Sequence, residues 1–142
     1  MRLLIVSINY APEIISTGVY TTGLAEFMAQ NGVETHVVTA HPYYPAWRTF
    51  EGWRRPWWTH RKEREVDIVH CPIYVPAKPS GLRRILHYIS FAATSLPIML
   101  WKSIVRKPDI VVLIAPSIIT APGVLAAARL CRATAWLHVQ DY

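Results

Sequence analysis

The sequence lacks the residue patterns that form disulfide frameworks, metal sites and catalytic cysteine–histidine pairs. Its 142 residues include only two cysteines, Cys71 and Cys131, which cannot form a disulfide framework. We therefore expect a reducing compartment and a role for both cysteines as small buried hydrophobic residues. The six histidines show neither the H-E-x-x-H spacing nor a paired C-x-x-C element, and so no metal site is predicted. His70 and Cys71 are neighbours, which places their side chains on opposite faces of a strand and argues against a catalytic pair.

Long apolar runs are lacking as well. The strongest membrane candidate, Tyr88–Trp101, has fourteen mostly apolar residues and is interrupted by Pro97 and by serine and threonine. A membrane-spanning helix needs about 20 apolar residues. The apolar start of the chain, Met1–Ile8, is too short for the apolar core of a signal peptide. The sequence therefore predicts neither a transmembrane helix nor a signal peptide.

Acidic residues are scarce, with nine Asp and Glu against fifteen Lys and Arg. The net charge of +6 indicates an anionic partner, which is a phosphate-bearing ligand, a membrane surface or a nucleic acid. No recognition motif accompanies the charge, and so nucleic acid is not expected. The region Lys78–Lys107 holds six cations and no acidic residue, and its charges bracket the apolar stretch Ile85–Val105. Such a helix can lie on an anionic leaflet; the alternative is a buried kinked helix with solvated ends. The predicted membrane contacts are Arg83, Arg84, Trp101, Lys102 and Arg106.

Strand-like and helix-like stretches alternate along the chain. The strand-like stretches are Arg2–Ile8, Val33–Ala40, Val66–Cys71 with Ile73–Val75, Asp109–Ile114 and Thr134–Val139. The helix-like stretches are Gly18–Gln30, Gly81–Arg106, kinked or broken at Pro97, and Ile118–Cys131. Alternation of this kind implies right-handed crossovers and a parallel sheet. With 52% hydrophobic residues, residues 1–142 are predicted to form one α/β domain, a Rossmann-like open parallel sheet flanked by helices. Only the tryptophan-rich His41–Lys62 shows no clear periodicity.

Polar and ring-bearing residues follow each predicted strand. Open parallel sheets bind ligands at the carboxyl ends of their strands, so these residues predict a ligand site along one edge. They are Ser7, Asn9 and Tyr10 after the first strand, Thr39 and His41 after the second, His70 and Cys71 after the third, Ser117 after the fourth, and His138, Gln140 and Asp141 after the fifth. Ser117 and Asp141 have the alternative role of capping a following helix, and His138 that of closing its strand.

The loop after the first predicted strand ends in Thr17-Gly18, next to the start of a helix. Small residues there allow backbone N–H groups to approach an anionic ligand; the alternative is that Gly18 is an ordinary loop glycine. Gly18 and Gly23 are five residues apart and no G-x-G-x-x-G element is present. A nicotinamide-type fingerprint is therefore absent.

Several stretches together resemble the N-terminal domain of a family-four retaining glycosyltransferase of the GT-B fold. They are Leu3–Ser7, Tyr10–Glu13 with Gly18, Leu24–Ala25 with Asn31–Thr39, Pro108–Val112 and Trp136–Asp141. The similarity is greatest to the colanic-acid-type glycosyltransferases of exopolysaccharide biosynthesis. It extends over essentially all 142 residues.

The resemblance implies an enzyme of two Rossmann-like domains. Residues 1–142 are then the acceptor-side domain, and a C-terminal domain outside this sequence holds most contacts to the nucleotide-sugar donor. Gly18 takes the position near the donor diphosphate, with Thr17 where the family commonly has a second glycine. His138 takes the position at the reaction centre, and Asp141 matches the acidic residue that follows it.

The resemblance also implies the reaction and its partners. A hexosyltransferase of this kind transfers a sugar with retention from a GDP- or UDP-linked donor, with no obligatory metal and no further cofactor. The expected acceptor is a lipid-linked glycan, and the expected place is the anionic cytoplasmic face of the cell membrane. The 142-residue chain alone is expected to be inactive. The other interpretation is a non-catalytic Rossmann-like module that binds a nucleotide or a membrane and recruits a partner.

Overall fold

The computed structural model describes residues 1–10, 17–43, 57–76, 78, 80–114 and 120–138. Its elements in chain order are β1 (Arg2–Val6), α1 (Thr17–Gln30), β2 (Glu34–Ala40), β3 (Thr59–Glu63), β4 (Val66–Cys71), α2 (Gly81–Val105), β5 (Ile110–Ile114), α3 (Ala121–Cys131) and β6 (Thr134–His138). The predicted Rossmann-like α/β domain is confirmed. Ile73–Val75, predicted to extend the third strand, lies outside every strand.

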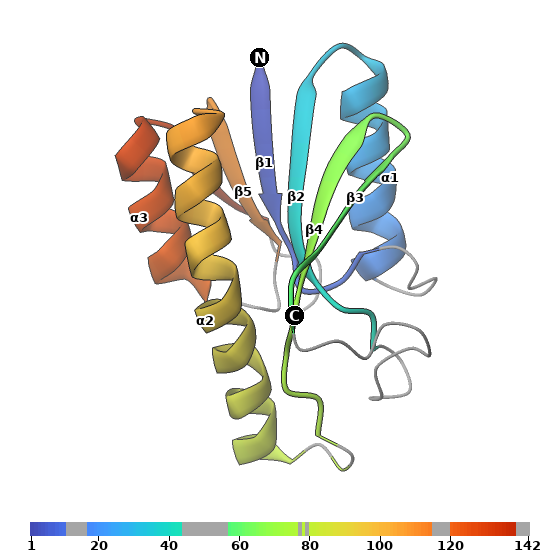
Figure 1. The fold of residues 1–142 in the computed structure, drawn as a ribbon, viewed down its shortest axis with the longest axis vertical. Helices are drawn as coiled ribbons and strands as arrows, with labels where there is room; N and C mark the ends of the chain where they lie inside the picture. The colour runs from blue at the N-terminus through green and yellow to red at the C-terminus, as the bar shows by residue number, and fades with distance from the viewer. Residues whose placement is uncertain (11–16, 44–56, 77, 79, 115–119, 139–142) are drawn as a thin grey trace.

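The sheet has six strands in the order β3-β4-β2-β1-β5-β6 (Figure 1). Five of these strands run parallel, and β1 lies at the centre with Ile5 opposite Val37 of β2 and Val112 of β5. Strand β4 pairs outside β2, and β6 pairs outside β5. The carboxyl ends of the parallel strands therefore meet at one edge, as the alternation of strands and helices predicts.

The sequence does not predict the edge strand β3, which makes the sheet mixed rather than fully parallel. It pairs antiparallel with β4, across a turn in which Arg64 and Glu65 have φ of 51° and 68°. Positive φ at both central residues is typical of a type I′ hairpin turn. The strand itself is polar throughout, without the apolar alternation that indicates a strand. Backbone pairing with β4, and not burial, positions β3.

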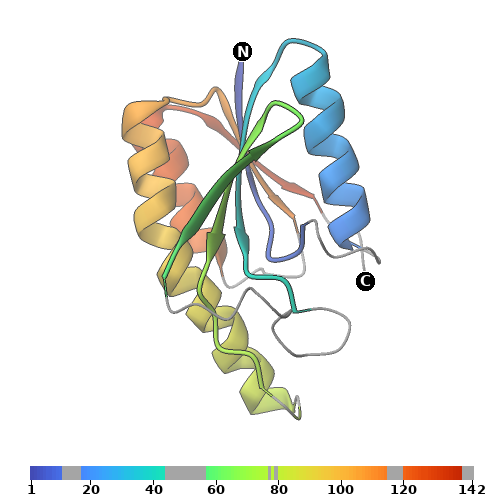
Figure 2. The same cartoon turned by 45° about the vertical axis from the view of Figure 1, so that its right-hand side comes forward.

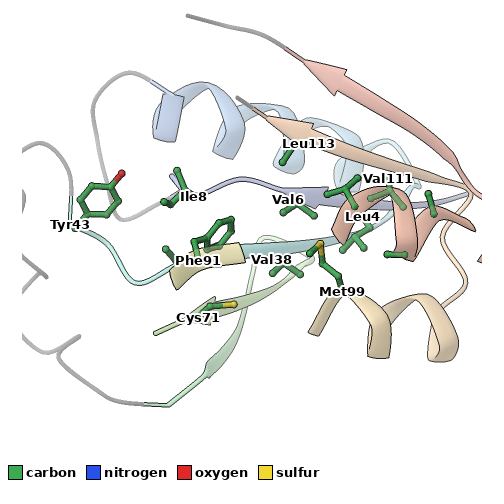
Figure 3. Packing of buried hydrophobic residues seen from close by; sticks show 14 residues of the cluster. Leu4, Val6, Ile8, Val38, Tyr43, Cys71, Phe91, Met99, Val111 and Leu113 are labelled. Carbon is green, nitrogen blue, oxygen red and sulfur yellow. The ribbon is translucent and has the colours of Figure 1, made fainter. Parts of the chain in front are cut away.

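Helices cover both faces of the sheet (Figures 1 and 2). Since alternate strand residues point to opposite faces, the sheet carries two separate apolar clusters. The cluster on the α1 face includes Ile5, Val37 and Ala25. The cluster on the α2–α3 face includes Leu4, Val38, Phe91, Met99 and Val124 (Figure 3).

Helix α2 is a single helix of 25 residues. The Ser80 hydroxyl accepts a hydrogen bond from the Arg83 backbone N–H at 3.4 Å and caps its start. The helix continues through Pro97, where the sequence predicts a kink or a break. Because α2 is much longer than the strands, its N-terminal half extends past the carboxyl edge of the sheet (Figures 1 and 2).

Helix α3 packs closely against α2 at Gly123. A Cβ atom added there would lie 3.0 Å from Cε of Met99 and 3.2 Å from Cδ1 of Leu96. A larger residue fits only if these two side chains move, and so the small residue at this position sets the short distance between the helices.

Candidate functional site

After β1 and β5, two neighbouring strands at the centre of the sheet, the chain continues to helices on opposite faces. The segment after β1 leads to α1 on one face, whereas the segment after β5 leads to α3 on the other. Because β1 and β5 are adjacent, their carboxyl ends form a topological switch point, where open α/β sheets bind ligands. Figure 1 shows these ends at the lower edge of the sheet. The predicted ligand edge therefore has its centre between β1 and β5.

The residues predicted for the donor and acceptor site all follow β1, β5 or β6 in the sequence. Thr17 opens α1, and Gly18 is buried in the first turn of that helix. His138 is the last residue of β6 and pairs with the end of β5. Ser117 and Asp141 lie outside the described residues. The topology brings Gly18 and His138 to the same edge of the sheet, and the roles of all five residues stay predictions.

Polar side chains are buried on the α1 face of this edge. Tyr10 follows β1 and belongs to the apolar cluster under α1, Thr21 lies in the second turn of α1, and Thr39 is near the end of β2. All three hydroxyls are buried and have no hydrogen-bond partner within the described part of the chain. Burial, together with the negative charge of Glu26, raises the pKa of Tyr10. The three hydroxyls are thus neutral and are candidate contacts for a polar ligand.

A histidine–arginine pair lies on the same face. The Nδ1–H group of His70 donates to the carbonyl of Ala40 at 2.9 Å, and Nε of Arg61 donates to His70 Nε2 at 3.0 Å. Burial above all, and then the charges of Arg61 and His41, lower the pKa of His70 to about 4, although the bond to Ala40 opposes the shift. At neutral pH, His70 is therefore a neutral acceptor that positions the Arg61 guanidinium.

The sequence identifies the strand-exit residues of this edge but not Thr21 or Arg61. The orientation of Thr21 is readable from the sequence, because Ala25 and Ala29 follow at four-residue intervals and mark the sheet-facing side of α1. Arg61 is not readable in this way, since nothing in Thr59–Glu63 indicates a strand.

The prediction that Lys102 contacts a membrane is wrong. Its side chain is only 4% exposed and lies between α2 and the sheet, with Nζ 3.1 Å from Nδ1 of His36. His36 Nε2 in turn lies 3.1 Å from a carboxylate oxygen of Glu34, and a carboxylate oxygen of Asp67 lies 3.7 Å from His36 Nδ1. Burial lowers the pKa of both Lys102 and His36. Lys102 thus belongs to an internal polar network near the amino ends of the strands.

The other predicted membrane contacts, Arg83, Arg84, Trp101 and Arg106, are exposed. The side of α2 that faces away from the sheet also carries exposed apolar residues, which we call the outer face of α2. They recur at helical spacing and are Leu82, Ile85, Leu86, Ile89 and Ile104. Since the sheet-facing side is also apolar, α2 is hydrophobic on two sides.

By length and composition alone, α2 would pass for a membrane-spanning helix, contrary to the expectation from the sequence. Its most apolar window has a mean hydropathy of 1.3, and 28% of that window is buried within the domain. In the fold, however, α2 is the crossover between β4 and β5, and it packs on α3 and the sheet. Its position is that of a domain helix with one apolar side uncovered.

Cys71 has the structural role that the sequence predicts for it. That residue is buried under α2, opposite to the face of His70, and burial raises its pKa to about 12. Such a thiol is unreactive. Cys131 is half-buried and its thiol donates to the Ala127 carbonyl at 3.3 Å. Among the described residues, no group of three His, Cys, Asp or Glu side chains is placed to hold a metal ion.

The chain is similar in sequence to a known protein. No protein-family profile matches the chain. The chain is 41% identical, over an alignment of 143 positions that includes all of it, to WcaI of Escherichia coli (strain K12), provisionally named a colanic acid biosynthesis glycosyl transferase. The chain is a relative of WcaI. It spans about a third of the length of that protein (34%).

The relation to WcaI confirms the predicted resemblance to colanic-acid-type glycosyltransferases over the whole chain. The carboxyl edge around β1 and β5 is where sheets of this topology bind ligands.

Proposed function

We propose that this chain is the acceptor-side domain of a glycosyltransferase that transfers a sugar from a nucleotide-sugar donor to a glycan in exopolysaccharide or surface-glycan biosynthesis. The observation that carries this proposal is the 41% identity to WcaI along the whole chain. The switch point between β1 and β5 supports it, because ligands of such sheets bind there. In this proposal the domain is the N-terminal half of a GT-B fold, and a second half binds most of the donor.

The proposed chemistry depends on the start of α1. The donor diphosphate, carried by GDP or UDP, lies against the N-terminal turn at Thr17 and Gly18, where backbone N–H groups and the helix dipole favour negative charge. The same groups stabilise the charge that develops on the leaving diphosphate, and so no metal is required. His138 contacts the reacting sugar, and Ser117 and Asp141 contact the donor or the acceptor. The sugar is transferred with retention of its configuration.

We further propose that the acceptor is lipid-linked and that the domain lies on the cytoplasmic face of the cell membrane. The outer face of α2 supports this, because a helix with apolar residues on two sides is rarely left in water. Exposed arginines at both ends of α2, Arg83, Arg84 and Arg106, favour an anionic leaflet. The N-terminal half of α2 also reaches past the carboxyl edge (Figure 2), which would bring a membrane-held acceptor close to the proposed site.

The reading frame beyond residue 142 tests the two-domain arrangement. We expect a second Rossmann-like half with a Glu-x7-Glu element, and we expect the 142-residue chain alone to transfer no sugar. Without such a half, the enzyme proposal fails and a non-catalytic module that binds a nucleotide or a membrane is the better interpretation. Transfer by the isolated chain would contradict the assignment of donor binding to another domain.

Replacing His138 with alanine in the two-domain protein tests the proposed reaction centre. We expect kcat to fall at least about tenfold, because the substitution removes a group that contacts the reacting sugar. The measurement is release of GDP or UDP from sugar nucleotides with a lipid extract as acceptor. The matched control is His60→Ala on β3, whose side chain is 61% exposed, and it should keep full activity. An unchanged kcat in a folded His138→Ala variant would remove this residue from the site.

A further inference from the structure

A groove opens between the C-terminal ends of α2 and α3. It has a volume of about 320 Å³ and is lined by Ser103, Ile104, Lys107, Leu130, Cys131 and Arg132. Figures 1 and 2 show these two helix ends side by side, at the end of the domain opposite to the carboxyl edge of the sheet. The proposed transfer reaction therefore leaves this groove without a role.

The lining of the groove is both cationic and apolar. Lys107 and Arg132 contribute two positive charges, whereas Ile104 and Leu130, which are 61% and 52% exposed, contribute hydrocarbon surface. None of the described residues that line the groove is acidic. Asp109, the nearest carboxylate along the chain, is engaged elsewhere, because it accepts a hydrogen bond from the backbone at the start of β1 at 2.8 Å. A ligand that fits this lining carries negative charge and hydrocarbon together.

Both cations occupy backbone positions that favour glycine. Lys107 has φ of 46° and Arg132 has φ of 59°, each just past the end of its helix. Helices commonly place glycine in this left-handed position because an L side chain is strained there. The backbone N–H of Arg132 still caps α3 by donating to the carbonyls of Ala128 and Arg129. The chain thus keeps a cation at two positions where glycine would suit the fold better.

The groove is continuous with the outer face of α2. Ile104 belongs to both, and the exposed apolar residues continue from it along α2 as far as Leu82. Trp101 is also exposed, three residues before Ile104, and tryptophan favours the interface between a membrane and water. Acyl chains in contact with α2 would therefore place their phosphates beside Lys107 and Arg132.

We propose that the groove binds the phosphate headgroup of an anionic phospholipid and thereby holds the α2–α3 face of the domain on the leaflet. A soluble phosphate compound shares the headgroup chemistry, but it would leave the apolar lining and the outer face of α2 in water. This inference rests on the membrane contact in the proposed function and gives it a binding site. Vesicle binding is measured without sugar transfer, and so the failure of one proposal is distinguishable from the failure of the other.

The test is co-sedimentation of the chain with vesicles of phosphatidylcholine, with and without phosphatidylglycerol. The double variant Lys107→Gly/Arg132→Gly removes both cations and places glycine at two left-handed positions, so the fold should be kept or stabilised. We expect binding to the phosphatidylglycerol vesicles and a loss of roughly fivefold in affinity per cation, or roughly 30-fold in the double variant. Quenching of tryptophan fluorescence by lipids with brominated chains should be weaker in Trp101→Phe than in the parent chain, and the difference should report insertion of this face.

A matched control is Arg64→Gly, because Arg64 is also an exposed arginine with φ of 51° and lies in the β3–β4 turn at the other edge of the sheet. It should bind the vesicles within about twofold of the parent chain, since charges far from the leaflet are screened. Equal binding by the parent chain and the double variant would overturn the proposal, as would an equal loss in Arg64→Gly. Full competition by inorganic phosphate would replace the lipid with a soluble anion.

Discussion

Replacing Phe91 with alanine should lower the free energy of unfolding by about 3–5 kcal/mol, a large part of the total stability of a domain of this size. Phe91 is fully buried on the sheet-facing side of α2, in the same cluster as Val38 and Cys71 (Figure 3). The substitution leaves a cavity between helix and sheet that the surrounding side chains fill only in part. Urea unfolding followed by circular dichroism measures the change.

The matched control for Phe91 is on the same helix. Leu82→Ala also removes a large apolar side chain, but Leu82 is 69% exposed on the outer face of α2, and the change should stay within about 0.5 kcal/mol. Similar losses for the two variants would mean that the sheet-facing side of α2 is not the side that anchors the helix.

Acidification from pH 6.5 to pH 4 should cost the domain about 3 kcal/mol through His70 alone. The pKa of His70 falls from its ordinary value of 6.5 to about 4 in the fold, and a tenfold difference in proton affinity between the folded and unfolded chain corresponds to about 1.4 kcal/mol. Because the unfolded chain binds the proton more readily, the stabilisation is complete above pH 6.5 and is lost as the pH falls toward 4. The pKa values of His36 and His87 are lowered as well, and both act in the same direction.

Burial is the largest cause of the low pKa of His70, and the contact with Arg61 adds to it. His70 Nε2 accepts a hydrogen bond from Arg61, and a proton on this atom would remove the acceptor and place two cations side by side. Urea unfolding between pH 4 and pH 7 gives the slope, and His70→Gln should flatten it, whereas His60→Gln on the exposed side of β3 should not. NMR titration of the His70 ring is an independent measurement. A midpoint near 6.5 would contradict the predicted dependence.

Most of the fold can be predicted because buried elements are recognisable by their apolar residues. Ile110–Ile114 is apolar at every position, since β5 lies inside the sheet. Helix α1 ends at Gln30, as the sequence predicts, and Gly32 just beyond it has φ of 85°, which only glycine adopts easily. In these elements the local preference of the sequence and the tertiary contacts favour the same structure.

The prediction is wrong where a tertiary contact outweighs the local pattern. Strand β3, which nothing in its own polar sequence predicts, depends on its pairing with β4. Helix α2 is not broken at Pro97, although a break is one of the two predicted outcomes, because residues on both sides of the proline pack in the cluster between α2 and the sheet. Lys102 and Arg84 are both basic residues of one helix, but only the structure shows that Lys102 faces His36. Sequence spacing on a helix indicates which residues share a face, although it does not indicate which face is covered.

The candidate site is predictable to a similar extent. The carboxyl edge follows from the order of strands and helices, and so the neighbourhood of Gly18 and His138 is readable from the sequence. The groove at Lys107 and Arg132 cannot be predicted from the sequence, because its two sides come from helix ends that are far apart in the chain. They meet only because α3 packs on α2 at Gly123.

The two outer strands of the sheet differ in how their free edges can pair with a further strand. Strand β3 carries Arg61, Lys62 and Glu63 along its edge, and charged side chains of this kind oppose the addition of another strand. Strand β6 has no charged residue, and Trp136 and Leu137, on opposite faces, are 58% and 48% exposed. Strand β3 is therefore protected against pairing with a further strand, whereas β6 is the edge of the sheet at which a further strand can pair.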